Sequence, residues 1–236
     1  MGDNYMLVIE RLNEECERLK LPQQRLCSYM HMLQSNFSKS KTGHRRFSYP
    51  EVKGLCDSMA DVFYIFTGIK APCSHGLPEL PFTHPEELLC CLNSVYLHSK
   101  AAKSMNQNST VFGTIQKQLE YIQCTAGSID DRNNVFYQIQ HRYGYTQDSM
   151  AELLGVSTRS LQALEKGTKL PDSEMIWKMY DRFLVSPAFI LNDPKGMRNE
   201  LNYVLSLLEE DDREIMLKIL ENGYRLIRPR GRKDKY

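Results

Sequence analysis

Apolar residues recur at helical spacing along most of the chain, and strand-like alternation is rare. Over residues 4–19 they fall on one helix face and are Tyr5, Ile9, Leu12, Cys16 and Leu19. Further helical runs are predicted over 23–30, 48–58, 85–103, 111–124, 130–143, 195–208 and 210–224. The pattern therefore predicts an all-α fold.

Two short helices joined by a tight turn are predicted over residues 146–167. Thr146 and Ser157 each precede an apolar run, where their hydroxyls can cap a first turn. Gly155 and Gly167 follow the runs, and glycine adopts positive φ at no steric cost. The buried stripes are Met150, Ala151, Leu154, Leu161 and Leu164. Helices at this spacing form a helix-turn-helix, whose second helix enters the DNA major groove.

The residues of this stretch resemble the helix-turn-helix of lambda-repressor-like bacterial regulators, of the phage repressor, Cro and xenobiotic-response-element type. The similar positions are Gln147, Ala151, Gly155, Val156, Ser157, Leu161, Glu165 and Gly167. The resemblance implies two more helices, over 172–184 and 186–191. The family often places an arginine against the glutamate that Glu165 matches. Here Gln140 stands at that position, and a hydrogen bond can replace the ion pair.

Polar residues cover the face of the second helix opposite Leu161 and Leu164. Arginine can pair with guanine and glutamine with adenine in the major groove. With the resemblance, this face implies a DNA-contacting set of Gln147, Thr158, Arg159, Ser160, Gln162 and Lys166. The alternative is a solvated helix face that binds nothing.

The N-terminal part of the chain repeats this pattern 124 positions earlier. The pairs Arg18/Arg142, Gln23/Gln147, Gly43/Gly167 and Asp57/Asp181 are identical. His31 replaces the turn glycine, Leu33 replaces the second cap and Lys41 replaces Glu165. Ser48 and Glu51 form a capping box for a fourth helix. We therefore interpret residues 1–69 as a degenerate second helix-turn-helix domain, with residues 128–193 as the domain that resembles the family.

The equivalent DNA-facing surface of the first copy is more basic than that of the second. Residues 1–69 hold nine Lys/Arg and eight Asp/Glu, whereas residues 128–193 hold seven and nine. Its candidate DNA contacts are Gln23, Gln34, Ser35, Asn36, Ser38, Lys39, Arg45 and Arg46. This copy either reads DNA or has become an interaction module that kept its fold.

Residues 70–127 are predicted to be a linker followed by a helical middle region. Its potential metal ligands are Cys73, His75, His84, Cys90, Cys91 and His98. Their spacing differs from that of structural zinc sites, so no metal and no cofactor are expected. Cys91 and Cys124 are more simply read as small buried residues.

Residues 194–224 are predicted to form two C-terminal helices. The apolar positions of the second are Ile215, Leu217, Ile219 and Leu220. These helices, or those of the middle region, either mediate a homodimer or pack on their own domain.

The basic tail, residues 225–236, contains six Lys/Arg and one Asp. Arg228 to Lys233 resembles an AT-hook, which would place Arg230 and Arg232 in a minor groove. The alternative is unspecific contact with phosphates.

Composition and motifs narrow the function further. No apolar run approaches the roughly 18 residues that span a bilayer, so no membrane partner is expected. Seven cysteines without a secretory signal indicate a reducing, cytoplasmic location. No catalytic motif is present, so an enzyme is not expected. The sequence predicts a DNA-binding transcription regulator, of repressor type, that binds double-stranded DNA. The alternative is a protein-interaction or ligand-sensing module that retains the helix-turn-helix fold.

Overall fold

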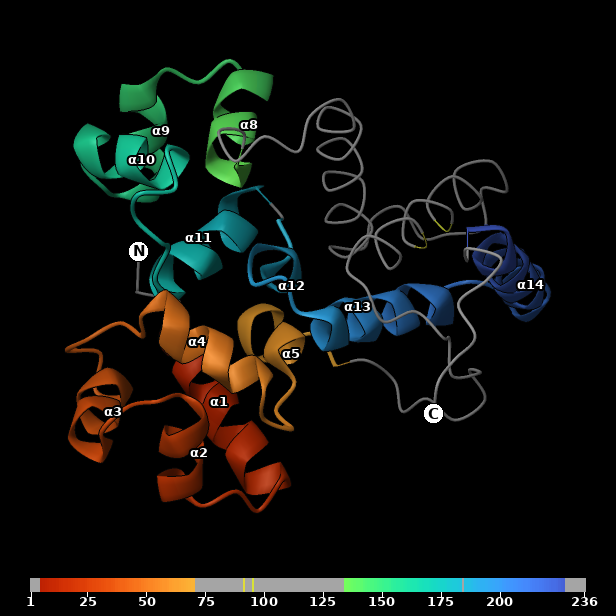
Figure 1. Ribbon diagram of the computed structural model, residues 1–236, viewed down its shortest axis with the longest axis horizontal. Coiled ribbons are helices and arrows are strands. Elements are labelled where there is room, and N and C mark those ends of the chain that lie inside the picture. The colour runs from red at the N-terminus through yellow and green to blue at the C-terminus, as the bar shows by residue number, and fades with distance from the viewer. Residues whose placement is uncertain (1–4, 71–90, 92–94, 96–133, 184, 228–236) are drawn as a thin grey trace.

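The computed structural model describes residues 5–70, 91, 95, 134–183 and 185–227 (Figure 1). Within these ranges every regular element is a helix, in agreement with the predicted all-α class. None of the described helices is long and apolar enough to cross a membrane. Apart from residues 91 and 95, the predicted helix over 85–103 lies outside the described residues, as do the predicted helix over 111–124 and the tail after residue 227.

Five helices form what we call the first unit, coloured red to orange in Figure 1. They are α1 (Met6–Arg18), α2 (Gln23–Tyr29), α3 (Gln34–Lys41), α4 (Tyr49–Cys56) and α5 (Val62–Thr67). Most of the apolar face predicted for the first helix is buried: Tyr5, Ile9 and Leu12 are at most 2% exposed, whereas Cys16 and Leu19 are half-buried. The capping box is present: Ser48 N donates to Glu51 Oε2 at 2.7 Å, at the start of α4.

Five further helices form what we call the second unit, coloured green to blue-green in Figure 1. They are α8 (Val135–Arg142), α9 (Gln147–Leu154), α10 (Thr158–Glu165), α11 (Ser173–Phe183) and α12 (Pro187–Ile190). The core of this unit contains all five apolar residues predicted for the stripes of α9 and α10. Asn134 caps α8, since its Oδ1 accepts hydrogen bonds from Phe136 N and Tyr137 N.

The two units follow the same course along the backbone. Helices α9, α10 and α11 begin 124 positions after α2, α3 and α4. All eight described residues with positive φ fall into pairs at that same offset. The pairs are Lys20 and Gly144, His31 and Gly155, Gly43 and Gly167, and Gly68 and Asn192. His31, which replaces the turn glycine, therefore adopts the same left-handed conformation as its counterpart Gly155, at φ +51°.

Helix α5 was not predicted from the sequence, which indicated four helices in the first copy and an end near residue 69. Residues 62–66 of α5 are all buried, so the run has no polar face that would reveal a helical period. The two signals that mark its ends are local. Asp61 caps the first turn by accepting from Tyr64 N, and Gly68 ends the helix at φ +78°.

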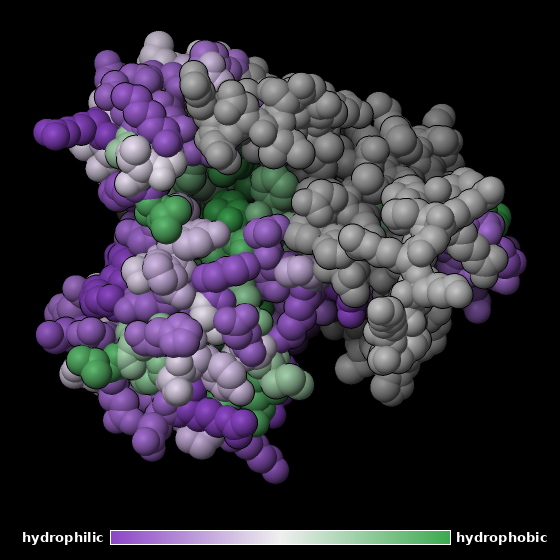
Figure 2. All heavy atoms as spheres, in the orientation of Figure 1, coloured by the Kyte–Doolittle hydropathy of each residue, from purple (hydrophilic) through white to green (hydrophobic). Residues whose placement is uncertain are grey.

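The units pack against each other through α4, α5, α11 and α12. Ile176 of α11 and Leu191, which follows α12, lie in the core of the first unit. Hydrophobic side chains gather where the units meet, and the outer surface of both is mostly hydrophilic (Figure 2). The contact between the units is therefore continuous with a hydrophobic core.

Helices α13 (Pro194–Ser206) and α14 (Glu210–Ile227) lead away from the two units (Figure 1). They share a core cluster with Phe63 of α5 and with Cys91, which is buried as predicted. The predicted apolar face of α14 was partly wrong. Met216 and Leu220 are buried, but Ile215 and Ile219 are 49% and 46% exposed, because they lie one residue out of phase with that pair. The helix also continues to Ile227, three residues into the predicted tail.

Candidate nucleic-acid interface

The α9–α10 turn is built from short local signals. Thr146 Oγ1 accepts from Ser149 N at 3.1 Å, and Ser157 Oγ accepts from Ser160 N at 3.2 Å. Each hydroxyl satisfies one amide that the first turn of a helix leaves unpaired. Gly155 ends α9 in the left-handed region, at φ +67° and ψ +39°. The chain can therefore reverse within three residues and place α10 across α9.

The outer face of α10 carries the predicted contacts. Arg159 and Lys166 are exposed, and Thr158, Ser160 and Gln162 are half-buried. Thr158 Oγ1 donates to Asp148 Oδ1 at 2.8 Å, and Lys169 Nζ donates to Ser160 Oγ at 3.3 Å. Arg159 makes no side-chain hydrogen bond or ion pair with any described residue, so its guanidinium is available to a ligand. Thus the structure brings the predicted set of the second unit together on one surface.

Behind this face, a cluster of polar side chains joins α8, α9 and α10. Gln162 Nε2 donates to Gln147 Oε1 at 2.7 Å, and Gln147 Nε2 donates to Glu165 Oε2 at 3.3 Å. With its amide nitrogen facing Glu165, Gln140 donates to Glu165 Oε1 at 2.6 Å and accepts from Gln147 N at 3.2 Å. This agrees with the expectation that a hydrogen bond can replace the family's ion pair.

Burial governs the charge of this cluster. Glu165 is only 6% exposed. Burial raises the pKa of its carboxyl above the usual value, and the Gln147 hydrogen bond offsets part of that shift. The two amides that donate to Glu165 hold α10 in a defined position relative to α8 and α9. Gln147 and Gln162, which bond to each other, therefore help to position α10 in addition to belonging to the predicted DNA-contacting set.

The predicted contacts of the first unit lie on and beside α3. Gln23, Gln34, Ser35, Ser38 and Lys39 are exposed, and Asn36 is half-buried. Helix α3 has no side-chain cap, because Leu33 occupies the cap position and is 69% exposed. In Figure 1, α3 and α10 both lie toward the left edge of the molecule, away from α13 and α14.

Arg45 and Arg46 are half-buried and engaged within the protein. Arg45 Nη2 donates to Glu51 Oε1 at 2.7 Å. Arg46 Nε donates to Glu174 Oε2 at 2.5 Å, and its guanidinium lies 4.3 Å from the centroid of the Tyr5 ring. Burial alone would raise the pKa of Glu174, but hydrogen bonds from Lys178 and Arg46 outweigh it and hold the pKa below its usual value. Arg46 thus links the two units, a role that sequence reasoning missed.

Other polar contacts between the units centre on Ser173, the first residue of α11. Its Oγ lies 2.6 Å from the Tyr5 hydroxyl and accepts from Phe47 N at 3.0 Å, while Ser173 N donates to Phe47 O at 2.9 Å. Burial raises the pKa of Tyr5 to about 12, so its hydroxyl stays protonated. No local pattern in the sequence indicated these pairings, which join residues more than 120 positions apart.

Two lysines each bind a pair of backbone carbonyls near the contact between the units. Lys53 Nζ of α4 donates to Leu191 O and Asn192 O, at 2.6 and 2.8 Å. Lys195 Nζ of α13 donates to Ser58 O and Ala60 O, at 2.9 and 2.8 Å. Leu191 and Asn192 follow the end of α12, where carbonyls lack partners within the helix, so Lys53 stabilises that end. Ser58 and Ala60 lie between α4 and α5, so Lys195 ties α13 to that loop. The two units are thereby held in one relative orientation.

Two further sets of predicted residues are the arginines of the basic tail and the potential metal ligands. Arg230 and Arg232 lie outside the described residues, as do the potential metal ligands other than Cys91. Among the residues that the structure describes, no group of three His, Cys, Asp or Glu side chains could hold a metal ion.

The fold and the geometry of α9 and α10 define a helix-turn-helix. Residues 140–190 match the sequence family described as Helix-turn-helix. The matched segment runs from the end of α8 through α12, so this part of the chain is similar to helix-turn-helix domains of the lambda-repressor-like type. No curated protein and no solved structure matches the chain.

Proposed function

We propose that the protein is a sequence-specific DNA-binding transcription regulator that inserts α10 into a major groove. The observation that carries this proposal is the exposed polar face of α10 within a segment that matches the helix-turn-helix family. Arg159 is the principal base-reading side chain, since it is exposed and can pair with both guanine acceptors. The amide donors at the start of α9 and α10 are suited to phosphates.

The first unit acts as a second DNA-reading domain in this proposal. Its support is the shared offset of 124 residues, at which three helix starts and four pairs of positive-φ residues coincide. Exposed Gln34, Ser38 and Lys39 occupy on α3 the positions that Thr158, Gln162 and Ala163 occupy on α10. Arg45 and Arg46 then act chiefly within the protein.

Packing between the units would fix the distance between α3 and α10. A dimeric repressor presents its two recognition helices to half-sites about 34 Å apart, one turn of the DNA. One chain with two docked units can present such a pair without a partner. Because the exposed residues of α3 and α10 differ, the two half-sites would differ in sequence and the operator need not be palindromic.

The same proposal includes repression, a homodimer and a cytoplasmic location. A chain that covers two turns of DNA excludes other proteins from that site, which favours repression. The exposed pair Ile215 and Ile219 on α14 supports a homodimer through the C-terminal helices. A cytoplasmic location follows from the proposed role.

An electrophoretic mobility shift tests the second unit directly. Fragments that bind the full chain are first selected from random DNA, and Arg159→Ala is then compared with the wild type. Loss of one bidentate base contact should weaken specific binding by about 1–3 kcal/mol, or roughly 5- to 150-fold, and relax the preference at one base pair. Lys218→Ala, which removes an exposed positive charge on distant α14, serves as the charge-matched control.

The salt dependence separates this function from the interaction module. A DNA-binding chain loses affinity linearly on a log–log plot of affinity against salt, with a slope set by the phosphates contacted. Unchanged sequence preference in Arg159→Ala would remove α10 from the interface. Absence of any DNA binding at about 50 mM salt would instead favour a module that keeps the fold and binds another partner.

A further inference from the structure

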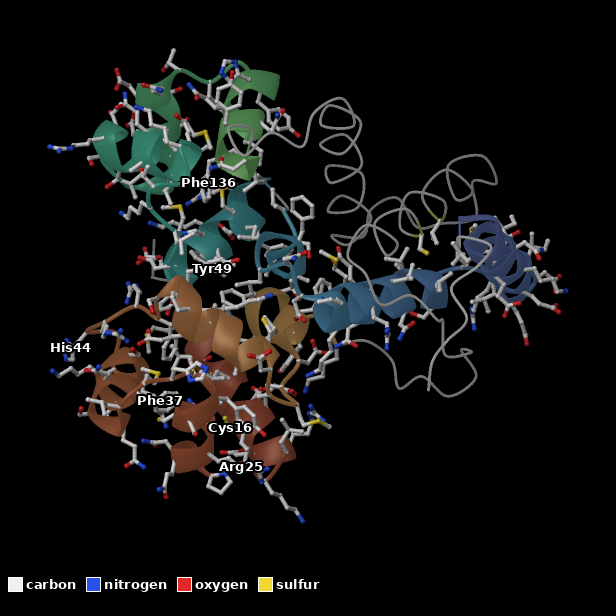
Figure 3. All side chains as sticks on the ribbon, in the orientation of Figure 1. Cys16, Arg25, Phe37, His44, Tyr49 and Phe136 are labelled. Carbon is white, nitrogen blue, oxygen red and sulfur yellow. The ribbon has the colours of Figure 1, made fainter. Side chains whose placement is uncertain are left out.

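A cavity of about 400 Å³ lies between α1, α2 and α3 of the first unit. Its lining residues are Asn13, Cys16, Glu17, Leu21, Gln23, Leu26, Phe37 and Lys41. Its volume is within the range of small-molecule sites, about 300–1,000 Å³. Figure 3 labels Cys16 and Phe37 among the helices that surround it.

In the second unit, residues of the polar cluster occupy the positions that correspond to three of the residues lining this cavity. Counting back 124 positions, Gln140 corresponds to Cys16, Gln147 to Gln23 and Glu165 to Lys41. The amide–carboxylate–amide contacts of the second unit are therefore replaced by a thiol, an amide and an ammonium group, which do not bond to one another. The cavity thus lies where the second unit fastens its recognition helix.

The walls of the cavity combine apolar and charged surface. Leu26 and Phe37 are at most 2% exposed and lie beneath its floor, and the half-buried Leu21 supplies its accessible apolar surface. Lys41 and Glu17 lie exposed at the rim, and within the described residues neither has an ion-pair partner. Although burial raises the pKa of the Cys16 thiol, the charge of Lys41 acts in the opposite direction, which places the ammonium group near the cavity wall.

We propose that this cavity binds a small monocarboxylate with an apolar body. The Lys41 ammonium group pairs with the carboxylate, the amides of Asn13 and Gln23 can donate to its oxygens, and the body covers the half-buried side chain of Leu21. A charge-assisted hydrogen bond is roughly twice as strong as a neutral one, so the carboxylate contributes strongly to recognition. Glu17 repels a second negative charge, so dicarboxylates are selected against.

A bound carboxylate would restore the missing connection between α3 and its neighbours. In the second unit, the carboxylate of Glu165 accepts from amides on α8 and α9; in the first unit, the ligand's carboxylate would take that place. The ligand would therefore hold α3 in a defined position. The binding site stands independently of DNA binding, whereas an effect of the ligand on DNA affinity rests on the proposed function.

Isothermal titration of the full chain with 3-phenylpropionate tests the site without DNA. We expect a Kd of about 1 mM or tighter. The neutral analogue 3-phenylpropanamide and the dianion phenylsuccinate should each bind at least tenfold more weakly. Lys41→Met should weaken 3-phenylpropionate binding at least tenfold, and Glu17→Gln should strengthen the binding of phenylsuccinate.

A double variant closes the cavity by design. Cys16→Gln with Lys41→Glu recreates the residues of the second unit's polar cluster and should abolish binding while the melting temperature is maintained or raised. Equal binding of the amide and the carboxylate, or undiminished binding by the double variant, would overturn the proposal, as would no heat of binding for 3-phenylpropionate at about 10 mM. Ligand binding without any DNA affinity would refute the proposed function and leave this site intact.

Discussion

Replacing Ser173 by alanine should reveal how firmly the two units are docked. The hydroxyl of Ser173 is fully buried, pairs with the Tyr5 hydroxyl at 2.6 Å and accepts from Phe47 N at 3.0 Å. Alanine leaves both partners without this hydrogen bond, and neither can reach water in the docked form. A buried polar group that loses its partner costs about 1–3 kcal/mol, so Ser173→Ala should lower the free energy of unfolding by roughly 2–4 kcal/mol.

Urea unfolding of the full chain, followed by circular dichroism, measures this loss. Tyr5→Phe is the matched comparison, because Ser173 Oγ still accepts from Phe47 N and only one hydrogen bond is removed. We expect Tyr5→Phe to cost about 1 kcal/mol, and the double variant to cost less than the sum of the two single changes. A change below about 0.5 kcal/mol for Ser173→Ala would refute the reasoning, since that is the range of an ordinary exposed position.

Two further perturbations follow from the packing and charge of the same region. The pKa of Glu174 is held below its ordinary value of 4.5. Its ion pairs therefore contribute stability that is fully present above pH 4.5 and is lost as the pH falls through the lowered pKa. Glu174→Gln should remove part of this acid-induced loss in urea titrations below pH 4.5, and an unchanged pH profile would contradict a stabilising role for these ion pairs. A Cβ at Gly54 would lie 2.1 Å from Tyr29 O, a backbone atom of α2. Gly54→Ala should therefore lower the unfolding free energy by about 3 kcal/mol, near the upper end for overpacking. A melting temperature within about 1 °C of the wild type would contradict this prediction.

Local signals in the sequence were sufficient for most of the helices. Thr146 and Ser157 cap helices as expected, and Gly155 ends α9 with positive φ. His31 could be placed because an aligned glycine stood 124 positions later. Such features depend on a few neighbouring residues, so they can be read without knowledge of the tertiary structure.

Long-range pairings could not be predicted in this way. Arg46 was read as a DNA contact because it lies in a basic run, but its partners Glu174 and Tyr5 come from distant positions. Helix α5 was missed because burial on all sides removes the helical period. The candidate DNA face of α10 was easier to define, since an exposed polar face is the complement of the buried stripe on the same short helix.

Selection of binding sites from random DNA with the full chain tests the central claim most directly. We expect an enriched site with two unlike halves, whose centres lie about 10 base pairs apart. Arg159→Ala should relax one half, and Gln34→Ala with Lys39→Ala should relax the other. Enrichment of a single half-site, unaffected by changes in α3, would contradict the paired arrangement, and the absence of any enriched sequence would contradict sequence-specific DNA binding.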